Sequence, residues 1–219
     1  MSGNAQERCR LVLIGPAAPD WRRSAEQIAD ALDGGDVASL ILWQGELCEA
    51  DFQKLCEAVV PAAQSAGVAA IVAGDSRIAG RTGADGIHSD KRDELADLVE
   101  AHSGRLIIGA GGARTRHDAL ELGELRPDYV FFGRFGYDTK PEPHPRNLGL
   151  GGWWAEFVEI PCIVMAGSVI ESIATVAATG AEFAAVSTAV FTGSTAPGEA
   201  VRRANALLDE KAPPLGEPA

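Results

Sequence analysis

Short apolar runs alternate with longer amphipathic segments along the chain. Each run is nearly continuous and ends near glycine, proline or a small polar residue, which predicts a buried strand, whereas the segments between them carry apolar residues at helical spacing. The predicted strands are 10–14, 37–43, 68–72, 86–88, 106–108, 129–132, 161–165 and 183–186. The predicted helices are 21–32, 51–66, a short one around Ile78, 91–101, 115–122, 153–158, 171–178 and 198–208.

These elements form eight strand–helix units, the arrangement typical of a single (β/α)8 TIM barrel. Continuous apolar strands fit this fold, since helices cover one face of the sheet and the packed interior covers the other. A doubly wound open sheet gives the same pattern and stays an alternative at this point. We expect residues 1–211 to form the barrel, 136–152 to be a long loop within it, and 212–219 to be a flexible C-terminal tail.

Composition and charge narrow the class of protein. The 219 residues are 46% hydrophobic and 23% charged, which excludes a disordered chain. A net charge of −12 at pH 7 repels phosphate-rich polymers and anionic membranes, so neither nucleic acid nor a membrane is an expected partner. We expect a cytoplasmic protein, because no run is long enough to cross a bilayer and the four scattered cysteines fit a reducing compartment. The sequence leaves a homodimer open.

Small residues follow the last two predicted strands. In TIM barrels phosphate is commonly held after the seventh and eighth strands, where this chain has Gly167 and Ser168, and then Ser187 and Thr188. Small side chains there let backbone N–H groups approach an anion. A tight turn also needs small residues, and for either exit alone this alternative is equally good. The two exits together predict small phosphorylated substrates as partners.

Two aspartates follow the third and fourth predicted strands. Asp75 and Asp93 are hard carboxylates that suit Mg²⁺ if one rim brings them together. Because the protein offers few oxygens, we expect Mg²⁺ to bind only with a diphosphate ligand. The alternative is helix N-capping, which is the better explanation for either aspartate taken singly.

The exits of the fifth and sixth predicted strands add glycines and positive charge. Gly111 lies in the run 109–114, which lacks the spacing of a nucleotide-binding P-loop and indicates a bare patch where a substrate or a loop comes close. Arg134 and Lys140 put two cations on the rim of an acidic protein, where anion binding competes with a solvated-surface role. His88, at the end of the fourth predicted strand, is either a base or a structural hydrogen-bonding group.

Two segments carry a resemblance to a known family. Residues 83–88 read Gly-Ala-Asp-Gly-Ile-His, and residues 128–133 read Asp-Tyr-Val-Phe-Phe-Gly, followed by Thr139 and Lys140. In this order and spacing the chain resembles the thiamine-phosphate synthases and their sister branch, the thiazole tautomerases. The resemblance runs from the first predicted strand to the last helix and leaves out only the tail.

The resemblance implies a TIM-barrel enzyme that joins a pyrimidine, delivered as its diphosphate, to a thiazole phosphate and releases pyrophosphate with Mg²⁺. Asp75 and Asp93 match the family's metal-binding aspartates, and Lys140 matches its pyrophosphate-binding lysine. Gly167 and Ser187 match the turns that hold the thiazole phosphate. Our catalytic candidates are therefore Lys140 and Arg134, and our substrate-binding candidates are Gly111, Thr139, Gly167, Ser168, Ser187 and Thr188.

Departures from the family pattern predict weak turnover. After the second strand the family carries two cations for the pyrophosphate, whereas residues 42–46 read Leu-Trp-Gln-Gly-Glu. The asparagine before the metal-binding aspartate is Gly74, the serine after the fifth strand is Gly111, a loop threonine is Tyr137, and the tautomerase's histidine is Arg134. Since each lost transition-state donor typically costs about 10²–10³ in rate, we expect synthase turnover to be absent or far below that of a complete family member.

Three hypotheses follow from this combination. The first is an enzyme of thiamine assembly in which Arg134 and Lys140 compensate for the cations lost after the second strand. The second is a barrel that keeps the phosphate turns and acts as a non-catalytic binding or regulatory protein. The third is a different phosphate-ester enzyme on the same fold, since a fold does not determine its chemistry.

Overall fold

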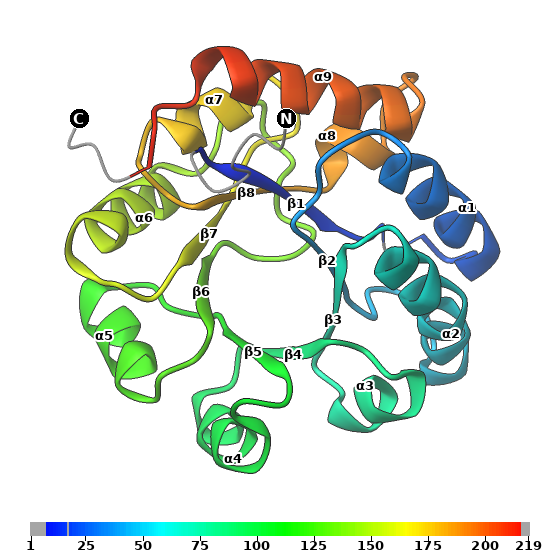
Figure 1. Cartoon of the computed structure of the whole chain (residues 1–219), viewed down its shortest axis with the longest axis horizontal. Helices are drawn as coiled ribbons and strands as arrows, with labels where there is room; N and C mark the ends of the chain where they lie inside the picture. Colours follow the sequence, from blue (N-terminus) through cyan, green and yellow to red (C-terminus); the bar gives the residue numbers. More distant parts are fainter. Residues whose placement is uncertain (1–7, 17, 216–219) are drawn as a thin grey trace.

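Eight parallel strands close into a barrel, which confirms the predicted (β/α)8 architecture (Figure 1). This computed structural model describes residues 8–16 and 18–215. Each strand pairs with its neighbours in chain order, and β8 pairs with β1, which excludes an open doubly wound sheet. The strands are β1 (Arg10–Ile14), β2 (Ser39–Leu42), β3 (Ala69–Ala73), β4 (Gly86–Ser89), β5 (Ile107–Ala110), β6 (Tyr129–Phe132), β7 (Cys162–Met165) and β8 (Phe183–Val186).

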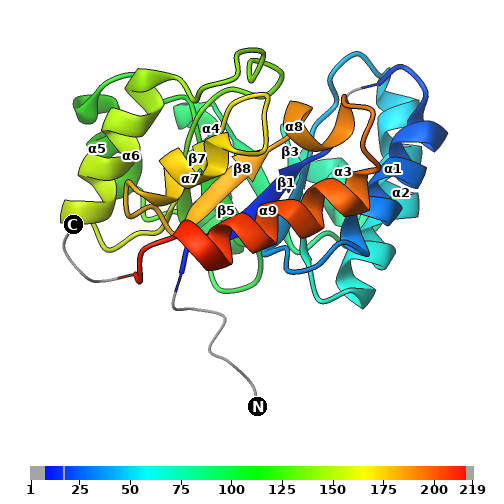
Figure 2. The same cartoon turned by 90° about the horizontal axis from the view of Figure 1, so that it is seen from above.

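Helices form the outer ring around the strands (Figure 1). They are α1 (Trp21–Leu32), α2 (Glu49–Ser65), α3 (Ser76–Thr82), α4 (Arg92–His102), α5 (Arg116–Glu124), α6 (Pro145–Phe157), α7 (Ser172–Ala177), α8 (Thr188–Phe191) and α9 (Pro197–Lys211). The last helix packs between α1 and α7 and lies along β1 and β8, as Figure 2 shows from above. It therefore covers the seam at which the barrel closes.

Alternating strand residues supply two separate cores. Val12 and Ile14 of β1 point into the barrel, whereas Leu11 and Leu13 belong to the layer between the strands and the helices. The interior is completed by side chains from other strands, namely Ile41, Ile71, Tyr129, Phe131, Ile163, Met165 and Ala185. Both faces of every strand are thus buried, which explains why the strands are continuous apolar runs.

The structure corrects one expectation about the chain between β6 and β7. Residues 136–152 were expected to form a long loop, but α6 begins at Pro145, with His144 as its N-cap, and includes Gly149, Gly151 and Gly152. Proline is well suited to the first helical turn, where its missing N–H costs nothing. Gly151 is required by packing, because a Cβ there would lie 2.3 Å from Val164. The prediction was wrong because composition suggested a loop where close packing selects glycine.

Two further features concern the character of the helices and the segment after α9. Within the described ranges, none of the helices combines the length and apolar character that crossing a membrane requires. After α9, Pro214 forms an isolated bridge with Arg8. Residues 216–219 lie outside the described residues, so the flexible tail at 212–219 stays a prediction.

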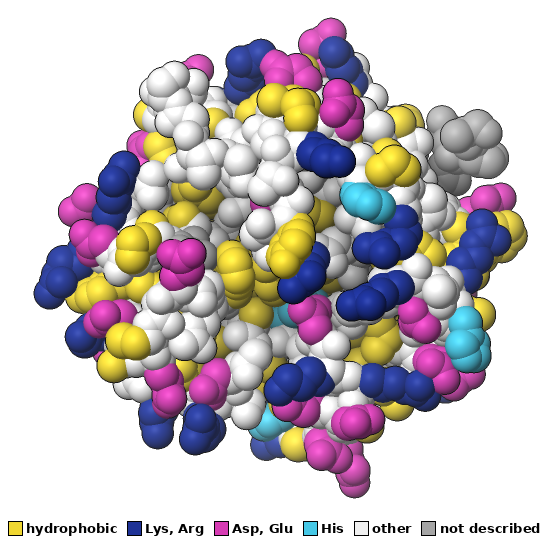
Figure 3. Space-filling view, turned by 180° about the vertical axis from the view of Figure 1, so that it is seen from behind, with side chains coloured by type: hydrophobic (Ala, Val, Ile, Leu, Met, Phe, Trp, Pro, Cys, Tyr) yellow, Lys and Arg dark blue, Asp and Glu magenta, His cyan; other side chains and the backbone are white. Residues whose placement is uncertain are grey.

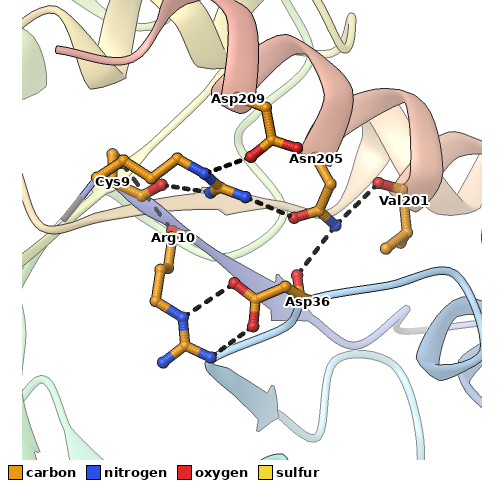
Figure 4. Close-up of polar contacts among 7 residues, drawn as sticks. Cys9, Arg10, Asp36, Val201, Asn205 and Asp209 are labelled. Atoms are coloured by element: carbon orange, nitrogen blue, oxygen red, sulfur yellow. Dashed lines mark hydrogen bonds and ion pairs between the residues drawn. The ribbon is translucent and has the colours of Figure 1, made fainter. Parts of the chain in front are cut away.

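Polar contacts fasten α9 to the start of β1 (Figure 4). The Arg8 guanidinium donates to Oδ1 of Asn205 at 3.3 Å, and Asn205 Nδ2 donates to the carbonyls of Asp36 and Val201 at 3.0 and 3.2 Å. Arg10 donates two hydrogen bonds to the Asp36 carboxylate at 3.0 and 2.6 Å. These hydrogen bonds, more than charge, hold the pKa of Asp36 below its usual value. Asn205 thus links α9 both to Arg8 and to Asp36, the residue whose carboxylate binds Arg10.

We expect Asn205→Ala to lower the free energy of unfolding by about 1–3 kcal/mol, because the partly buried carbonyl of Asp36 loses its donor. Urea denaturation measures the change. Asp209→Asn is the matched control, since it removes only the exposed ion pair with Arg8 and is expected to cost about 0–1 kcal/mol. Equal losses in the two variants would contradict the role given to Asn205.

Candidate active site

The C-terminal ends of the strands form the mouth of the barrel, which faces the reader in Figure 3. Among the described loops on this side, the one between β6 and α6, residues 133–144, is the longest. Figure 3 shows acidic and basic side chains around the centre of this face, with several basic side chains and a histidine to the right of the centre. We call residues 133–144 the β6–α6 loop, and the candidate site is built around it.

A buried histidine forms the floor of the mouth. His88, at the end of β4, is only 1% exposed. Its Nδ1 lies 3.1 Å from the hydroxyl of Tyr129, and its Nε2 lies 3.2 Å from Oδ1 of Asp90. The rings of Tyr129, Phe131 and Phe135 surround the imidazole, with centroids 5.7, 5.7 and 5.2 Å away. This packing fixes the ring and favours the structural role among the two predicted for His88.

This chain of hydrogen bonds ends on a carboxylate. Burial, with a contribution from the charge of Asp90, raises the pKa of Tyr129, so the phenol keeps its proton and is hydrogen-bonded to Nδ1 of His88. The Asp90 carboxylate accepts from Nε2 of His88. Burial alone would raise the pKa of Asp90, but the hydrogen bond and the charge of His88, together with the charge of Arg134, outweigh it and lower that pKa. Asp90 therefore presents a negative charge at the mouth.

Aromatic side chains pack at the exit of β2, where the resemblance led us to expect cations. The indole Nε1 of Trp43 donates to the carbonyl of Gly15 at 2.9 Å, and its ring lies 5.9 Å from that of Phe135. Phe135 in turn contacts Phe131 inside the barrel, with centroids 5.0 Å apart. Trp43 and Phe135 are only partly buried, so they form an aromatic wall open to the mouth.

The glycine run after β5 has a packing reason. A Cβ on Gly111 would lie 2.0 Å from Oδ1 of Asp90 and 2.8 Å from Nε2 of His88. The Gly111 N–H donates to the carbonyl of Ser89 at 3.0 Å. The Asp90 carboxylate thus fills the space that a side chain at residue 111 would need. The group that comes close to this glycine run is therefore a residue that follows β4.

A cavity of about 570 Å³ lies under the β6–α6 loop and beside the exit of β7. Its wall includes both catalytic candidates, Arg134 and Lys140, together with Arg146 at the start of α6. The guanidinium of Arg134 lies 3.8 Å from the ring of Tyr137, which is 62% exposed. Among the described residues, none of the three cations has a carboxylate within 4.0 Å. Unpaired positive charge therefore gathers at one place on an acidic protein.

The exits of β7 and β8 are bonded within the protein. The Gly167 N–H donates to Oγ of Ser172 at 2.9 Å, and the Ser168 N–H donates to the Lys140 carbonyl at 2.7 Å. The Thr188 N–H, at the start of α8, donates to Oδ2 of Asp138 at 2.7 Å. The β6–α6 loop thus lies across the two turns at which phosphate was predicted, and phosphate binding there stays a prediction.

Comparison with known proteins decides the family. Residues 11–190 match the family model for thiamine monophosphate synthase. The chain belongs to this family. It is 33% identical to a thiamine-phosphate synthase of Rhodospirillum centenum, over 91% of this chain and 98% of that protein. It is 35% identical to one of Hyphomonas neptunium, over 97% and 100%.

Solved structures support the same fold. The thiamine phosphate pyrophosphorylase of Pyrococcus furiosus superposes with a TM-score of 0.77 over 94% of this chain and 98% of that chain, at 20% identity. A tryptophan synthase structure from M. tuberculosis reaches a TM-score of 0.68 over 97% and 95%, at 18% identity. At these identities the superpositions support only the barrel fold. The family model and the two relatives make the protein thiamine-phosphate synthase-like.

Asp75 and Asp93 take different positions at the mouth. Asp75 caps α3, and its Oδ1 accepts from the N–H groups of Arg77 and Ile78 at 2.9 and 3.1 Å. Its Oδ2 meets only the exposed Arg77 guanidinium, at 3.4 Å. Asp93 lies exposed in the first turn of α4. In residues 8–16 and 18–215, no three His, Cys, Asp or Glu side chains are grouped as in a metal centre. This donor set fits Mg²⁺ only when a diphosphate supplies further oxygens.

Structure reveals functional candidates that sequence reasoning missed. Trp43, Asp90, Asp138 and Arg146 all shape the mouth, yet each stands outside the matched motifs. The sequence does indicate Asp138 as a site residue by its position, because it lies between Tyr137 and the candidate Thr139 in a loop that follows a predicted strand. No local pattern indicates that its partner is Thr188, because the two residues are distant in sequence and only barrel closure brings them together.

We expect Gly111→Ser to lower the free energy of unfolding by roughly 1–3 kcal/mol, because the new side chain displaces Asp90 from His88. In an Asp90→Ala background the same change should cost clearly less, with a coupling of about 0.5–3 kcal/mol. Urea denaturation of the four proteins measures this cycle. Additive losses would show that Asp90 does not fill the space beside Gly111.

The metal prediction is tested by calorimetry with inorganic pyrophosphate, with and without Mg²⁺. Asp75→Asn keeps an N-capping side chain but removes the charge, so we expect an unchanged urea midpoint and a gain in affinity from Mg²⁺ that falls about tenfold. Asp93→Asn should act in the same direction. Asp20→Asn, at the cap of α1, is the matched control. If the Mg²⁺ gain survives in both site variants, Asp75 and Asp93 are structural only.

Proposed function

We propose that this protein is a slow synthase-type transferase of thiamine assembly, which joins hydroxymethylpyrimidine diphosphate to a thiazole phosphate and releases pyrophosphate. The observation that carries the proposal is the group of three unpaired cations, Arg134, Lys140 and Arg146, around one cavity at the mouth. The wider family and the relatives that span the whole chain support the same activity.

The charge distribution suits a diphosphate. With 31 acidic residues against 19 Lys and Arg, the molecule as a whole repels anions. The three cations around this one cavity have no carboxylate partner within 4.0 Å among the described residues, so they form a place on this acidic protein that attracts an anion. When the bond to the pyrimidine breaks, its electron pair leaves on the diphosphate, and nearby guanidinium and ammonium groups stabilise the growing charge. Arg134 and Lys140 take this role in the proposal.

The aromatic wall suits the rings of the substrates. A pyrimidine and a thiazole are planar heterocycles that stack on aromatic side chains, and Trp43 and Phe135 present such a surface beside the cavity. His88 and Asp90 form the floor below them. The site thus combines stacking for two rings with positive charge for a leaving group, and excludes water from the barrel interior by its packed core.

The same wall explains the low turnover that we propose. Residues 42–46, where the resemblance leads to an expectation of cations, contain Trp43 and the acidic Glu46 but neither Lys nor Arg, so this exit supplies no positive charge. Among the described residues, the positive charge of the cavity wall comes from Arg134 and Lys140 in the β6–α6 loop and from Arg146 in α6. Asp75 and Asp93 would hold a Mg²⁺ ion together with the diphosphate, and the ion would supply a counter-charge for that group. The proposal places the protein in the cytoplasm, with small phosphorylated substrates as partners and without nucleic acid.

The test is formation of the thiamine-type product and release of pyrophosphate by the purified protein with Mg²⁺. We expect Arg134→Ala and Lys140→Ala each to lower kcat about 10²-fold, because each removes a donor to the leaving diphosphate. Glu46→Lys, which restores a cation near β2 without disturbing Trp43, should raise it. Arg116→Ala is the matched control, since Arg116 stacks on Trp153 in the same way but lies on α5.

Two results would overturn the proposal. Robust turnover that survives Arg134→Ala and Lys140→Ala would show that the diphosphate binds elsewhere. No turnover in the native protein or in Glu46→Lys, with pyrophosphate still bound, would favour the non-catalytic binding or regulatory barrel.

A further inference from the structure

An accessible carboxylate lies at the mouth with one oxygen free for a ligand. The Asp90 side chain is 52% exposed, and its Oδ1 accepts from Nε2 of the buried His88 at 3.2 Å. In the described ranges, no hydrogen bond joins its Oδ2 to another residue. Although burial alone would raise the pKa of Asp90, His88 and Arg134 lower it, so the carboxylate is charged at neutral pH. Asp90 therefore offers an anionic acceptor to a molecule in the mouth.

Two glycines of the run after β5 make room for Asp90. A Cβ on Gly111 would lie 2.0 Å from Oδ1 of Asp90, and a Cβ on Gly112 would lie 2.8 Å from its backbone carbonyl oxygen. Gly112 also has a φ of +89°, a conformation that other residues rarely adopt. Together with the hydrogen bond to His88, these contacts define where the carboxylate lies before a ligand binds. A polar group held in place in this way loses little conformational entropy on binding.

Asp90 has an aromatic surface and a cation as neighbours. The Phe135 ring packs on the His88 imidazole that binds Asp90, with the two ring centroids 5.2 Å apart. Arg134 precedes Phe135 in the chain, and its charge acts on the Asp90 carboxylate, yet the two side chains do not form an ion pair. Both Asp90 and Arg134 are exposed, so one ligand can contact the anion and the cation together.

We propose that Asp90 determines specificity for the pyrimidine substrate by accepting a hydrogen bond from the amino group on its ring, while Arg134 binds the diphosphate. This inference rests on the proposed function, and it names the ring substituent that the same site recognises. That substituent is a primary amine on the ring carbon next to the one that carries the diphosphate-bearing methylene group.

The substituents of such a ring match the charges of the site. An amine and a diphosphate arm on neighbouring ring carbons leave the ring on the same side, so their recognition requires an acceptor beside a cation. Asp90 and Arg134 meet this requirement. An ionised carboxylate has acceptor positions only, so it binds an N–H but repels the lone pairs of a carbonyl oxygen at the same ring position. The wall of Trp43 and Phe135 holds the ring by its face, and the hydrogen bond to Asp90 then fixes the orientation of its edge.

The negative charge of Asp90 is compatible with a diphosphate nearby. Arg134, Lys140 and Arg146 place three positive charges around the cavity, and Asp90 is not part of that cavity's wall. Half of the Asp90 side chain meets solvent, which screens its repulsion of the diphosphate. A role limited to orienting His88 would affect every ligand of the site alike. Ligands with and without the amine therefore distinguish the two roles.

Calorimetry on the whole protein with Mg²⁺ tests the inference. The two probes are hydroxymethylpyrimidine diphosphate with its amino group and an analogue in which hydrogen replaces that group. We expect the wild-type protein to bind the amino compound about 10–100-fold more tightly, the range of a hydrogen bond to a charged group. In Asp90→Ala this ratio should fall close to one, while the affinities for the analogue and for inorganic pyrophosphate stay unchanged.

A second variant and a control accompany this measurement. Gly111→Ala keeps the Asp90 carboxylate but puts a Cβ where its Oδ1 lies, so it should lower the ratio in the same direction. Glu100→Ala is the matched control, because it removes one exposed negative charge from α4, the helix that follows Asp90 in the chain. We expect the wild-type ratio in this control.

A wild-type ratio close to one would overturn the inference without any variant. It is also overturned if the ratio survives Asp90→Ala, because another residue then binds the amine. An equal loss of affinity for pyrophosphate and for the amino compound in Asp90→Ala would leave Asp90 with a structural role only. If the amino compound binds and forms product while the ratio is close to one, only the role of Asp90 is wrong. If neither diphosphate compound binds and no product forms, the proposed function fails as well.

Discussion

The pairing of β8 with β1 is the constraint on which the remaining structure depends. It aligns Arg10 to Leu13 with residues 183–186 and turns eight short strands into a ring. Without that ring, the exits of β6, β7 and β8 would not meet, and Asp138 would have no Thr188 to bind. The α9 helix covers the same seam, and Asn205 fastens it to the loop before β2. The stability of the seam at one end of the barrel and the geometry of the site at the other end thus both depend on the pairing of β8 with β1.

Strands were predictable because burial on both faces leaves a simple signature. Apolar runs at 10–14, 129–132 and 183–186 coincide with β1, β6 and β8 to the residue. The failure at α6 is equally instructive. Its glycines look like loop residues in the sequence, yet Gly151 is selected because α6 lies directly on Val164 of β7. Periodicity reports which residues are apolar, but it does not report how closely two backbones approach.

The candidate site was predictable only as far as chain position determines it. The strand-exit rule correctly directed attention to the mouth, where Arg134, Lys140 and Thr139 line one cavity. It did not reveal that the loop carrying them lies across the turns after β7 and β8. That outcome depends on hydrogen bonds such as Thr188 to Asp138, which join residues far apart in the chain. Which side chains pair in this way depends on the closure of the barrel, so no local sequence pattern predicts it.

Two departures from the family pattern are accompanied by contacts within the protein. Trp43, after β2, donates to the carbonyl of Gly15, and the space beside Gly111, after β5, is filled by the Asp90 carboxylate. The N–H of Thr188, after β8, is likewise bonded within the protein, to Asp138. The cations that line the cavity, Arg134, Lys140 and Arg146, belong to the β6–α6 loop and to the first turn of α6. Barrel closure brings this loop across the exits of β7 and β8, where the Lys140 carbonyl accepts from Ser168 and Asp138 accepts from Thr188. The position of the positive charge that the proposed reaction requires therefore depends on hydrogen bonds between distant parts of the chain.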